Sequence, residues 1–204
     1  MTDKNEQYFT AEPSSQHDYQ EISFDFSGKT LFFKTDAGVF SKNRIDYGTR
    51  VLLDCVADHY SEIRSGSILD LGCGYGVVGV ALKSLDPRRE LTMTDINLRS
   101  LALAKENLQR NQLDAEVLQS NIYDGLNGEF AAIVVNPPIR AGKQVVTKML
   151  TEAREHLSSG GMIFAVLQKK QGAPSAEKNL MAAFGNVEIL KRDKGYYVLR
   201  STKQ

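Results

Sequence analysis

Three short, largely apolar runs restrict the fold of this chain more than any other feature. They cover residues 68–71, 131–135 and 163–167. Such runs, without strict alternation, are typical of parallel strands that are buried on both faces. The segments between these runs have the spacing of helices. Apolar residues recur every three or four positions over 98–108 and over 146–157. Strands that alternate with helices predict a doubly wound, mostly parallel α/β sheet.

The segments on either side of these units predict antiparallel hairpins. Residues 22–26 and part of 30–35 alternate apolar with polar side chains around Ser27-Gly28, after a polar stretch broken by Pro13. A loop over 37–41 and an amphipathic helix over 48–60 follow. Residues 187–190 and 196–200 predict a second hairpin that closes the sheet. We therefore expect an N-terminal extension over residues 1–47 and one compact domain over residues 48–204.

Composition excludes several classes of protein. The chain has 204 residues, 42% hydrophobic and 25% charged, which is ordinary for one globular domain. The 25 basic and 25 acidic side chains cancel, so a nucleic acid must be met by a local basic patch. Two cysteines and three histidines without metal-ligand spacing disfavour a zinc site and a disulfide framework. A polar beginning and the lack of a long apolar run lead us to expect a cytoplasmic protein with no membrane segment.

The strongest local motif is the glycine loop, residues 70–79, which follows the first apolar run. Its Gly72, Gly74 and Gly76 let the backbone pass close to a ligand, and residues 74–79 also fit the dinucleotide fingerprint GxGxxG. Asp95 ends the next predicted strand (91–94), where a carboxylate can accept hydrogen bonds from ribose hydroxyls. The pattern predicts either a nicotinamide dinucleotide or S-adenosylmethionine as cofactor.

Asp70 favours S-adenosylmethionine. A dinucleotide brings a negatively charged pyrophosphate to this turn, where the Asp70 carboxylate would repel it. S-adenosylmethionine has no phosphate, and its cationic amino group and sulfonium are attracted to a carboxylate. The alternative interpretation is that Asp70 only caps the turn through backbone N–H groups.

The second motif is Asn136-Pro137-Pro138-Ile139, directly after the apolar run 131–135. It therefore comes at the carboxyl end of a central strand, where doubly wound folds bind ligands. Two prolines fix the backbone and remove two N–H donors. A rigid row of acceptors remains, and it suits a planar amino group whose nitrogen is presented to an electrophilic methyl. Taken alone, the segment could also simply end a strand, because Asn-Pro often starts a turn.

The glycine loop, Asp95 and the Asn-Pro-Pro-Ile segment resemble motifs of class I S-adenosylmethionine-dependent methyltransferases. More narrowly, the chain resembles the "small" methyltransferase domain of RsmC-like ribosomal RNA guanine-N2 methyltransferases. Residues 38–41, the pattern Asp46-x-Gly48-Thr49 and residues 168–173 match that subgroup. The resemblance covers about residues 8–202.

The resemblance implies a seven-stranded, Rossmann-like sheet and a set of cofactor contacts. Asp70 and the first two glycines would line the methionine moiety, Asp95 would hold the ribose, and Asn121 would contact the adenine amine. Phe40, Ser41 and Thr49, which precede the first strand of the parallel sheet, would close over the cofactor. The implied cofactor-binding residues are Phe40, Ser41, Thr49, Asp70, Gly72, Gly74, Asp95, Ile96, Asn121, Ile122 and Asn136.

The implied catalytic residues are Asn136, Pro137, Pro138 and Ile139, with the first two holding the target amine. Two features depart from the family. Ile139 stands where many relatives have an aromatic residue, which weakens stacking on a base. This chain also has one methyltransferase domain, whereas well-known members carry a second, degenerate copy that binds substrate.

Basic residues near the predicted carboxyl edge of the sheet suggest contacts with RNA phosphates. Lys42 and Arg44 flank the front loop, and the others are Arg140, Lys143, Lys169 and Lys170. Charged loop residues also commonly face solvent alone. We interpret Lys191, Arg192 and Lys194 as solvated side chains of a hairpin distant from the site.

The sequence thus predicts an enzyme that moves a methyl from S-adenosylmethionine to an exocyclic amine of a base. The expected substrate is guanine N2 in small-subunit ribosomal RNA or the assembled subunit, with no metal and no cysteine nucleophile at Cys73. One alternative is an N-methyltransferase of protein glutamine amides, although those enzymes usually have Tyr in place of Ile139. A nicotinamide oxidoreductase and a non-catalytic cofactor-binding module are further alternatives.

Overall fold

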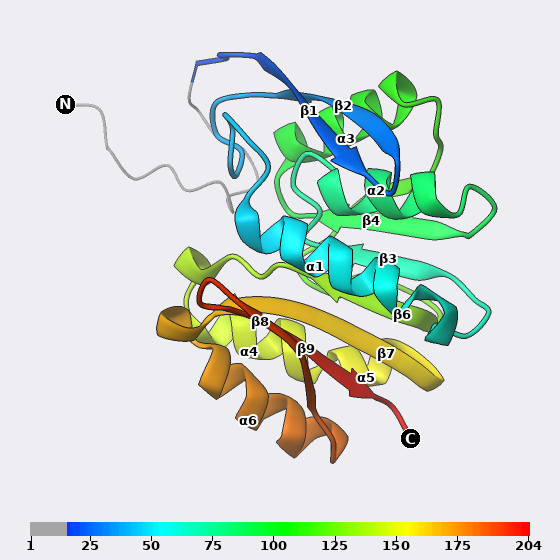
Figure 1. The fold of residues 1–204 in the computed structure, drawn as a ribbon, viewed down its shortest axis with the longest axis vertical. Coiled ribbons are helices and arrows are strands. Elements are labelled where there is room, and N and C mark those ends of the chain that lie inside the picture. Colours follow the sequence, from blue (N-terminus) through cyan, green and yellow to red (C-terminus); the bar gives the residue numbers. More distant parts are fainter. Residues whose placement is uncertain (1–15) are drawn as a thin grey trace.

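Seven strands form one sheet in the computed structural model, which describes residues 16–204 (Figure 1). The polar stretch around Pro13 lies outside the described residues. The strand order is β5-β4-β3-β6-β7-β9-β8. Neighbours from β5 to β7 pair in parallel, whereas β9 is antiparallel to both β7 and β8. The strands are β3 (Ile68–Leu71), β4 (Leu91–Asp95), β5 (Glu116–Gln119), β6 (Phe130–Val135), β7 (Leu157–Gln168), β8 (Glu188–Asp193) and β9 (Tyr196–Thr202).

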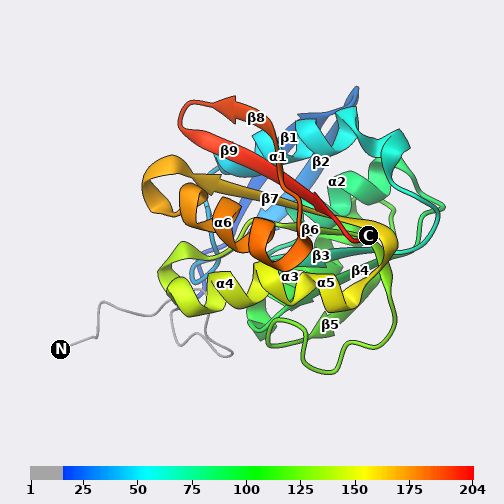
Figure 2. The ribbon, with the colours of Figure 1, turned by 90° about the horizontal axis from the view of Figure 1, so that it is seen from below.

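Helices cover both faces of this sheet (Figure 2). One face carries α1 (Tyr47–Asp58), α2 (Val77–Leu85) and α3 (Leu98–Arg110). The other carries α4 (Lys143–Thr151), α5 (Ala153–His156) and α6 (Ala173–Phe184). Alternate residues of β6 enter different cores, Val134 the first and Ile133 the second, and both are fully buried. Two covered faces explain why the strand reads as an apolar run, and the predicted doubly wound fold with a closing antiparallel hairpin is confirmed.

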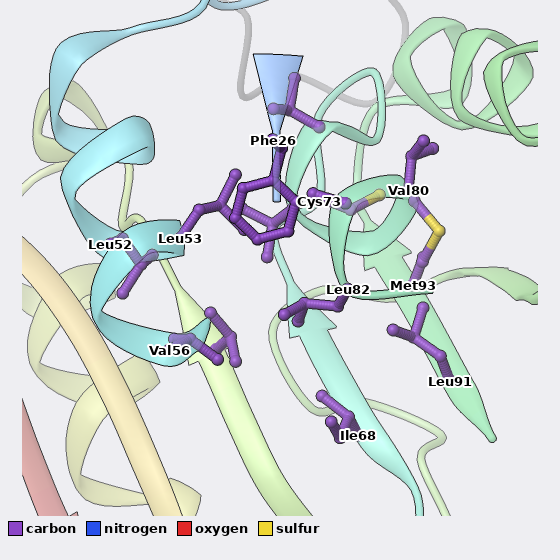
Figure 3. Packing of buried hydrophobic residues seen from close by; sticks show 14 of the residues in the cluster. Phe26, Leu52, Leu53, Val56, Ile68, Cys73, Val80, Leu82, Leu91 and Met93 are labelled. Atoms are coloured by element: carbon purple, nitrogen blue, oxygen red, sulfur yellow. The ribbon is translucent and has the colours of Figure 1, made fainter. Parts of the chain in front are cut away.

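The predicted N-terminal hairpin consists of β1 (Gln20–Phe26) and β2 (Lys29–Thr35). The buried Asn107 of α3 fixes it, because its side chain accepts from the Lys34 N–H at 2.7 Å and donates to the Lys34 carbonyl at 3.0 Å. Figure 3 shows Phe26 of the hairpin beside Leu53 of α1, in the core that also contains Leu82 and Met93. The hairpin is therefore packed onto the helices that border the site.

The single helix predicted over residues 146–157 is wrong. Helix α4 ends at Thr151, the four-residue α5 follows, and Leu157 already begins β7. Ala153 and Leu157 are both fully buried, so the periodicity correctly indicated burial. The chain leaves the helix at Leu157 because this residue pairs with Phe130 at the start of β6.

The placement of the C-terminal hairpin far from the site is also wrong. Strand β9 runs antiparallel to β7, so its first residue, Tyr196, pairs with Gln168 at the carboxyl end of β7. The Lys169 N–H donates to the Gly195 carbonyl at 2.7 Å. The turn that contains Lys194 therefore lies at the carboxyl edge of the sheet.

Three one-turn 3₁₀ helices complete the described elements, η1 (Tyr60–Glu62), η2 (Ile139–Ala141) and η3 (Lys169–Gln171). The latter two follow the carboxyl ends of β6 and β7.

Candidate active site

The carboxyl ends of β3, β4, β6 and β7 border a cavity of about 810 Å³. Strands β4 and β6 flank β3 on opposite sides, so the cavity lies at the topological switch point where doubly wound sheets bind ligands. Its volume is within the ordinary range for small-molecule sites. Every candidate site residue lines it: Phe40, Ser41, Thr49, Asp70, Gly72, Gly74, Asp95, Ile96, Asn121, Ile122, Asn136, Pro137, Pro138 and Ile139.

The glycine loop leaves room for a ligand at one end and permits close packing at the other. A Cβ on Gly74, whose φ is +55°, would meet no atom within 4 Å, and Gly74 lines the cavity. A Cβ on Gly79 would lie 2.6 Å from the Met93 sulfur. Gly79 therefore lets α2 pack closely on β4, which directs the N-terminus of α2 toward the cavity.

Asp70 is almost fully buried at the end of β3. Its Oδ2 accepts a hydrogen bond from the Gly79 N–H at 2.7 Å, so the carboxylate does hold the first turn of α2. Burial raises the pKa of Asp70 to about 7, and the nearby charge of Asp95 adds to the rise. A cation in the cavity would favour the ionised form of this carboxyl group.

Asp95 fixes the two loops beside it. Its Oδ2 accepts from the Gly74 N–H at 2.8 Å, and its Oδ1 accepts from the Asn97 N–H at 2.9 Å. Burial raises the pKa of Asp95, and these N–H donors oppose the rise. An ionised carboxylate has about four acceptor positions. The Ile96 N–H also interacts with this one, so limited acceptor capacity is left for a hydroxyl donor from the cavity.

Asn136 is held from behind by the start of α1. Its Nδ2 donates to Thr49 Oγ1 at 2.9 Å and lies 3.5 Å from Asp46 Oδ2. Asp46 caps α1 by accepting from the Thr49 N–H at 3.2 Å. Because its donor side is occupied, Asn136 keeps Oδ1 as an acceptor in the cavity lining. The sequence placed Thr49 near the cofactor but showed no link to Asn136, since 87 positions separate them.

Gln168 and Tyr196 form a second polar pair in the lining. Gln168 Nε2 donates to Tyr196 Oη at 2.6 Å across the β7–β9 ladder. A Cβ on Gly48 would lie 2.6 Å from the Tyr196 ring, so a glycine is needed where α1 passes this ring. Sequence reasoning missed Tyr196, because only the direction of β9 brings it here.

The front loop is tied to the start of α3. Arg99 Nη1 donates to the Ala37 carbonyl at 2.8 Å, and Asn97 Nδ2 donates to the Gly38 carbonyl at 3.3 Å. Tyr75 Oη, from the glycine loop, donates to the Ser41 carbonyl at 3.4 Å. These bonds hold Phe40 and Ser41 at the cavity.

Cys73 is buried, and its Sγ donates to the Gly74 carbonyl at 3.4 Å. Burial raises the pKa of this thiol well above its usual value, so the thiol stays protonated and is a poor nucleophile. Over residues 16–204, no three His, Cys, Asp or Glu side chains gather as metal ligands. In the same range, no helix is both long and apolar enough to cross a bilayer.

Residues 30–200 match the methyltransferase small domain family. The chain belongs to this family. It is 39% identical over 202 residues to the uncharacterized protein YbxB of Bacillus subtilis, covering 98% of this chain and 99% of that protein. It is 34% identical over 177 residues to the ribosomal RNA small subunit methyltransferase C of Erwinia tasmaniensis, covering 85% of this chain and 50% of that enzyme.

A solved structure gives a matching fold for this small-domain methyltransferase. It is the T. thermophilus 16S rRNA N2 G1207 methyltransferase (RsmC) in complex with AdoMet and guanosine, with a TM-score of 0.83 and 27% sequence identity. The match covers 94% of this chain and 52% of that one. The chain thus spans about half the length of the ribosomal RNA enzymes it resembles.

The cofactor of this small-domain methyltransferase is S-adenosylmethionine, and the nicotinamide alternative is dropped. The cavity fits it, because Gly74 faces open space and the buried Asp70 would repel a pyrophosphate but attract a cation. When bound, this cofactor supplies an electrophilic methyl group. The roles assigned to the individual cofactor-binding and catalytic residues stay predictions, since the cavity lining shows only that these residues lie together.

Proposed function

We propose that this protein methylates the exocyclic amine of a base in RNA, and that the base is guanine of small-subunit ribosomal RNA, modified at N2. The observation that carries the proposal is the Asn136 amide, whose donor side is bonded to Thr49. Its Oδ1 and the Pro137 carbonyl are acceptors at the end of β6, and Pro137 and Pro138 provide no N–H. Two acceptors match the two hydrogens of a planar amine.

These acceptors orient the amine rather than react with it. The two carbonyl oxygens would each accept a hydrogen bond from one N–H of the amine. They would hold the amine nitrogen in one position, with its remaining face available for methyl transfer. Positioning of this kind contributes several kcal/mol to a rate. The carbonyls bind most strongly as the amine gains positive charge, which favours the transition state over the ground state.

Exposed basic residues support an RNA substrate. Arg140 lines the cavity, Lys143 begins α4, and Lys169 and Lys170 lie on η3. All four side chains are exposed. Within the described part of the chain, none of these four lies within ion-pair distance of a carboxylate, whereas Lys42 is paired with Asp18. Unpaired cations around the mouth of the cavity would neutralise phosphates flanking a base that is flipped into it.

Analysis of modified nucleosides tests the proposal. Ribosomal RNA from a strain that lacks the protein is mapped by mass spectrometry, and the purified protein is then incubated with that strain's small subunits and methyl-labelled cofactor. We expect one N2-methylguanosine to be lost in the strain and restored in vitro. Label on a glutamine of a ribosomal protein, or on another base, would contradict the proposal.

The basic residues can be tested separately through salt dependence. A Lys169→Ala, Lys170→Ala double variant should bind RNA less tightly, and its log–log salt slope should fall by about 0.7 to 0.9 for each lost phosphate contact. Arg88 and Arg154 are exposed and precede β4 and β7, at the opposite edge of the sheet. Changing both to Ala should leave the slope unchanged. Equal slopes in the two double variants would show that Lys169 and Lys170 only face solvent.

A further inference from the structure

We propose that Gln168 and Tyr196 read the edge of the substrate base beside its target amine, and that they select guanine over adenine and cytosine. The inference rests on the proposed function, because it requires a base in the cavity. It assigns a recognition role to two residues outside the cofactor-binding and amine-holding sets.

The pair is built into the sheet. Gln168 is the last residue of β7 and Tyr196 the first of β9, and the two are cross-strand partners. Both are half-buried and line the cavity. The backbone ladder already joins the two strands here, so their side-chain hydrogen bond is not needed to close the sheet.

The start of α1 lies between this pair and Asn136 and contacts both. The Tyr196 ring packs on Gly48, where an added Cβ would lie 2.6 Å from the ring and 2.9 Å from Asp46 Oδ2. The same Asp46 oxygen lies 3.5 Å from Asn136 Nδ2. Asn136, Gln168 and Tyr196 line the same cavity, so we place the edge beside an amine held at Asn136 against the polar pair.

The hydrogen bond fixes what the pair offers to that edge. Gln168 Nε2 donates to Tyr196 Oη at 2.6 Å. This leaves Gln168 Oε1 as an acceptor and the Tyr196 hydroxyl proton as a donor.

Guanine presents the complementary groups. Next to its N2 amine come N1–H, a donor, and then O6, an acceptor. In adenine and cytosine, the ring nitrogen beside the exocyclic amine is an acceptor instead. This acceptor nitrogen would face the acceptor Gln168 Oε1, and no hydrogen bond could form between them. Two opposed acceptors disfavour binding of adenine and cytosine.

Nucleoside binding tests this independently of catalysis. Guanosine, inosine and 2-aminopurine riboside are titrated by ligand-observed NMR against the protein saturated with S-adenosylhomocysteine. Inosine lacks the amine but keeps N1–H and O6, whereas 2-aminopurine riboside keeps the amine and lacks both. We expect guanosine to bind most tightly, and 2-aminopurine riboside about tenfold more weakly, as for the loss of two hydrogen bonds at a partly open site. Inosine also loses two hydrogen bonds, those of the missing amine, but it should bind more tightly than 2-aminopurine riboside, whose N1 lone pair would face Gln168 Oε1.

Variants assign the effect to the two side chains. In Tyr196→Phe, which keeps the ring on Gly48, and in Gln168→Met, guanosine and inosine should weaken toward the level of 2-aminopurine riboside. The affinity for 2-aminopurine riboside itself should hardly change. Tyr197→Phe is the matched control, since Tyr197 does not line the cavity, and it should keep the wild-type order. An unchanged affinity for S-adenosylhomocysteine verifies folding.

Several results would overturn the inference. These are equal binding of guanosine and 2-aminopurine riboside, the same loss for all three nucleosides in Tyr196→Phe, and no guanosine binding at all. Methylation of adenine or cytosine in RNA by the wild-type enzyme would also overturn it while leaving RNA amine methylation intact. Label found only on protein, with the nucleoside order as expected, would instead contradict the proposed function.

Discussion

In the half of the cavity that we propose for the cofactor, carboxylates accept hydrogen bonds from backbone amides, whereas in the half that we propose for the substrate, side chains are hydrogen-bonded to one another. The cofactor half comprises residues 70–79 and Asp95, where the bonds from Gly79 and Gly74 span 9 and 21 positions. The substrate half comprises residues 136–139, Gln168 and Tyr196, with Thr49 behind them. Its bonds span 28 and 87 positions.

Because of this difference, we expect the two halves to tolerate amino-acid substitutions to different degrees. A backbone amide cannot be removed by substitution, other than by proline, so the glycine loop keeps its carboxylates oriented in most variants. A side-chain network changes with any one of its members. We therefore expect substrate choice to vary among small-domain methyltransferases while cofactor binding is retained.

Asn136→Ala should give the largest effect on turnover if the two halves of the cavity act separately. Turnover should fall on the order of a hundredfold, because a positioning contact to the amine is lost. Cofactor affinity should fall far less than turnover, although Asn136 is also among the implied cofactor-binding residues. Turnover is measured by single-turnover transfer of labelled methyl to the natural RNA, and cofactor affinity by calorimetry. Asn136→Asp keeps an acceptor and should retain more activity than the Ala variant. Wild-type rates in Asn136→Ala would mean that the segment only ends a strand.

Asp95→Ala should give the converse result. Loss of a charged hydrogen-bond partner costs about 1.5–3 kcal/mol, so cofactor affinity should fall about ten- to a hundredfold. The Gly74 and Asn97 amides also lose their acceptor, so a thermal melt must accompany the titration. An unchanged dissociation constant in a folded variant would remove Asp95 from the cofactor half.

Variants of Thr49 test whether this residue belongs to the cofactor half or to the substrate half of the cavity. If Thr49 acts by holding the Asn136 amide, Thr49→Ala should lower turnover about tenfold with little change in cofactor affinity. Thr49→Ser keeps the hydroxyl and should restore most of the rate. A loss of cofactor affinity that Ser does not rescue would place Thr49 with the cofactor contacts.

Asp70 predicts a smaller, pH-dependent effect. Its pKa near 7 means that the carboxyl is mostly protonated at pH 6 and becomes charged as the pH rises. Affinity for the cationic cofactor should therefore increase roughly fivefold between pH 6 and pH 7. Asp70→Asn should abolish this dependence in calorimetric titrations. A wild-type affinity that falls over this range would contradict the role of Asp70.

The same pKa has a consequence for stability. The ordinary pKa of Asp lies near 3.8, so the folded state binds this proton more tightly than the unfolded state. The stabilisation is complete below about pH 4 and is lost as the pH rises toward 7. At pH 8, Asp70→Asn should therefore melt at a higher temperature than wild type, if Asn still accepts from Gly79. A lower melting temperature would show that the charge itself is needed for folding.

The sequence was sufficient for the parts of the molecule that are local in the chain. The glycine loop and the segment at Asn136 each lie within one strand and the turn after it, so their residue types reveal the backbone that they need. Apolar runs gave the strands because both faces of the sheet are covered.

Features that depend on strand pairing could not be predicted in this way. Leu157 has helical spacing, yet its partner Phe130 makes it a strand residue. Tyr196 and Gln168 meet because β9 reverses against β7, and the bond from Asn136 to Thr49 depends on how α1 packs. Periodicity indicates which side chains are buried but not which neighbours they find.

The place of Tyr196 at the cavity also sets an order in time. A chain is synthesised from its N-terminus, so Thr49, the glycine loop and Asp95 leave the ribosome first, then Asn136, then Gln168, and Tyr196 after all of them. A nascent chain that has emerged only as far as η2 contains the glycine loop and the proposed amine acceptor but lacks both residues of the polar pair. Discrimination between bases would thus be acquired last, as the final strand enters the sheet.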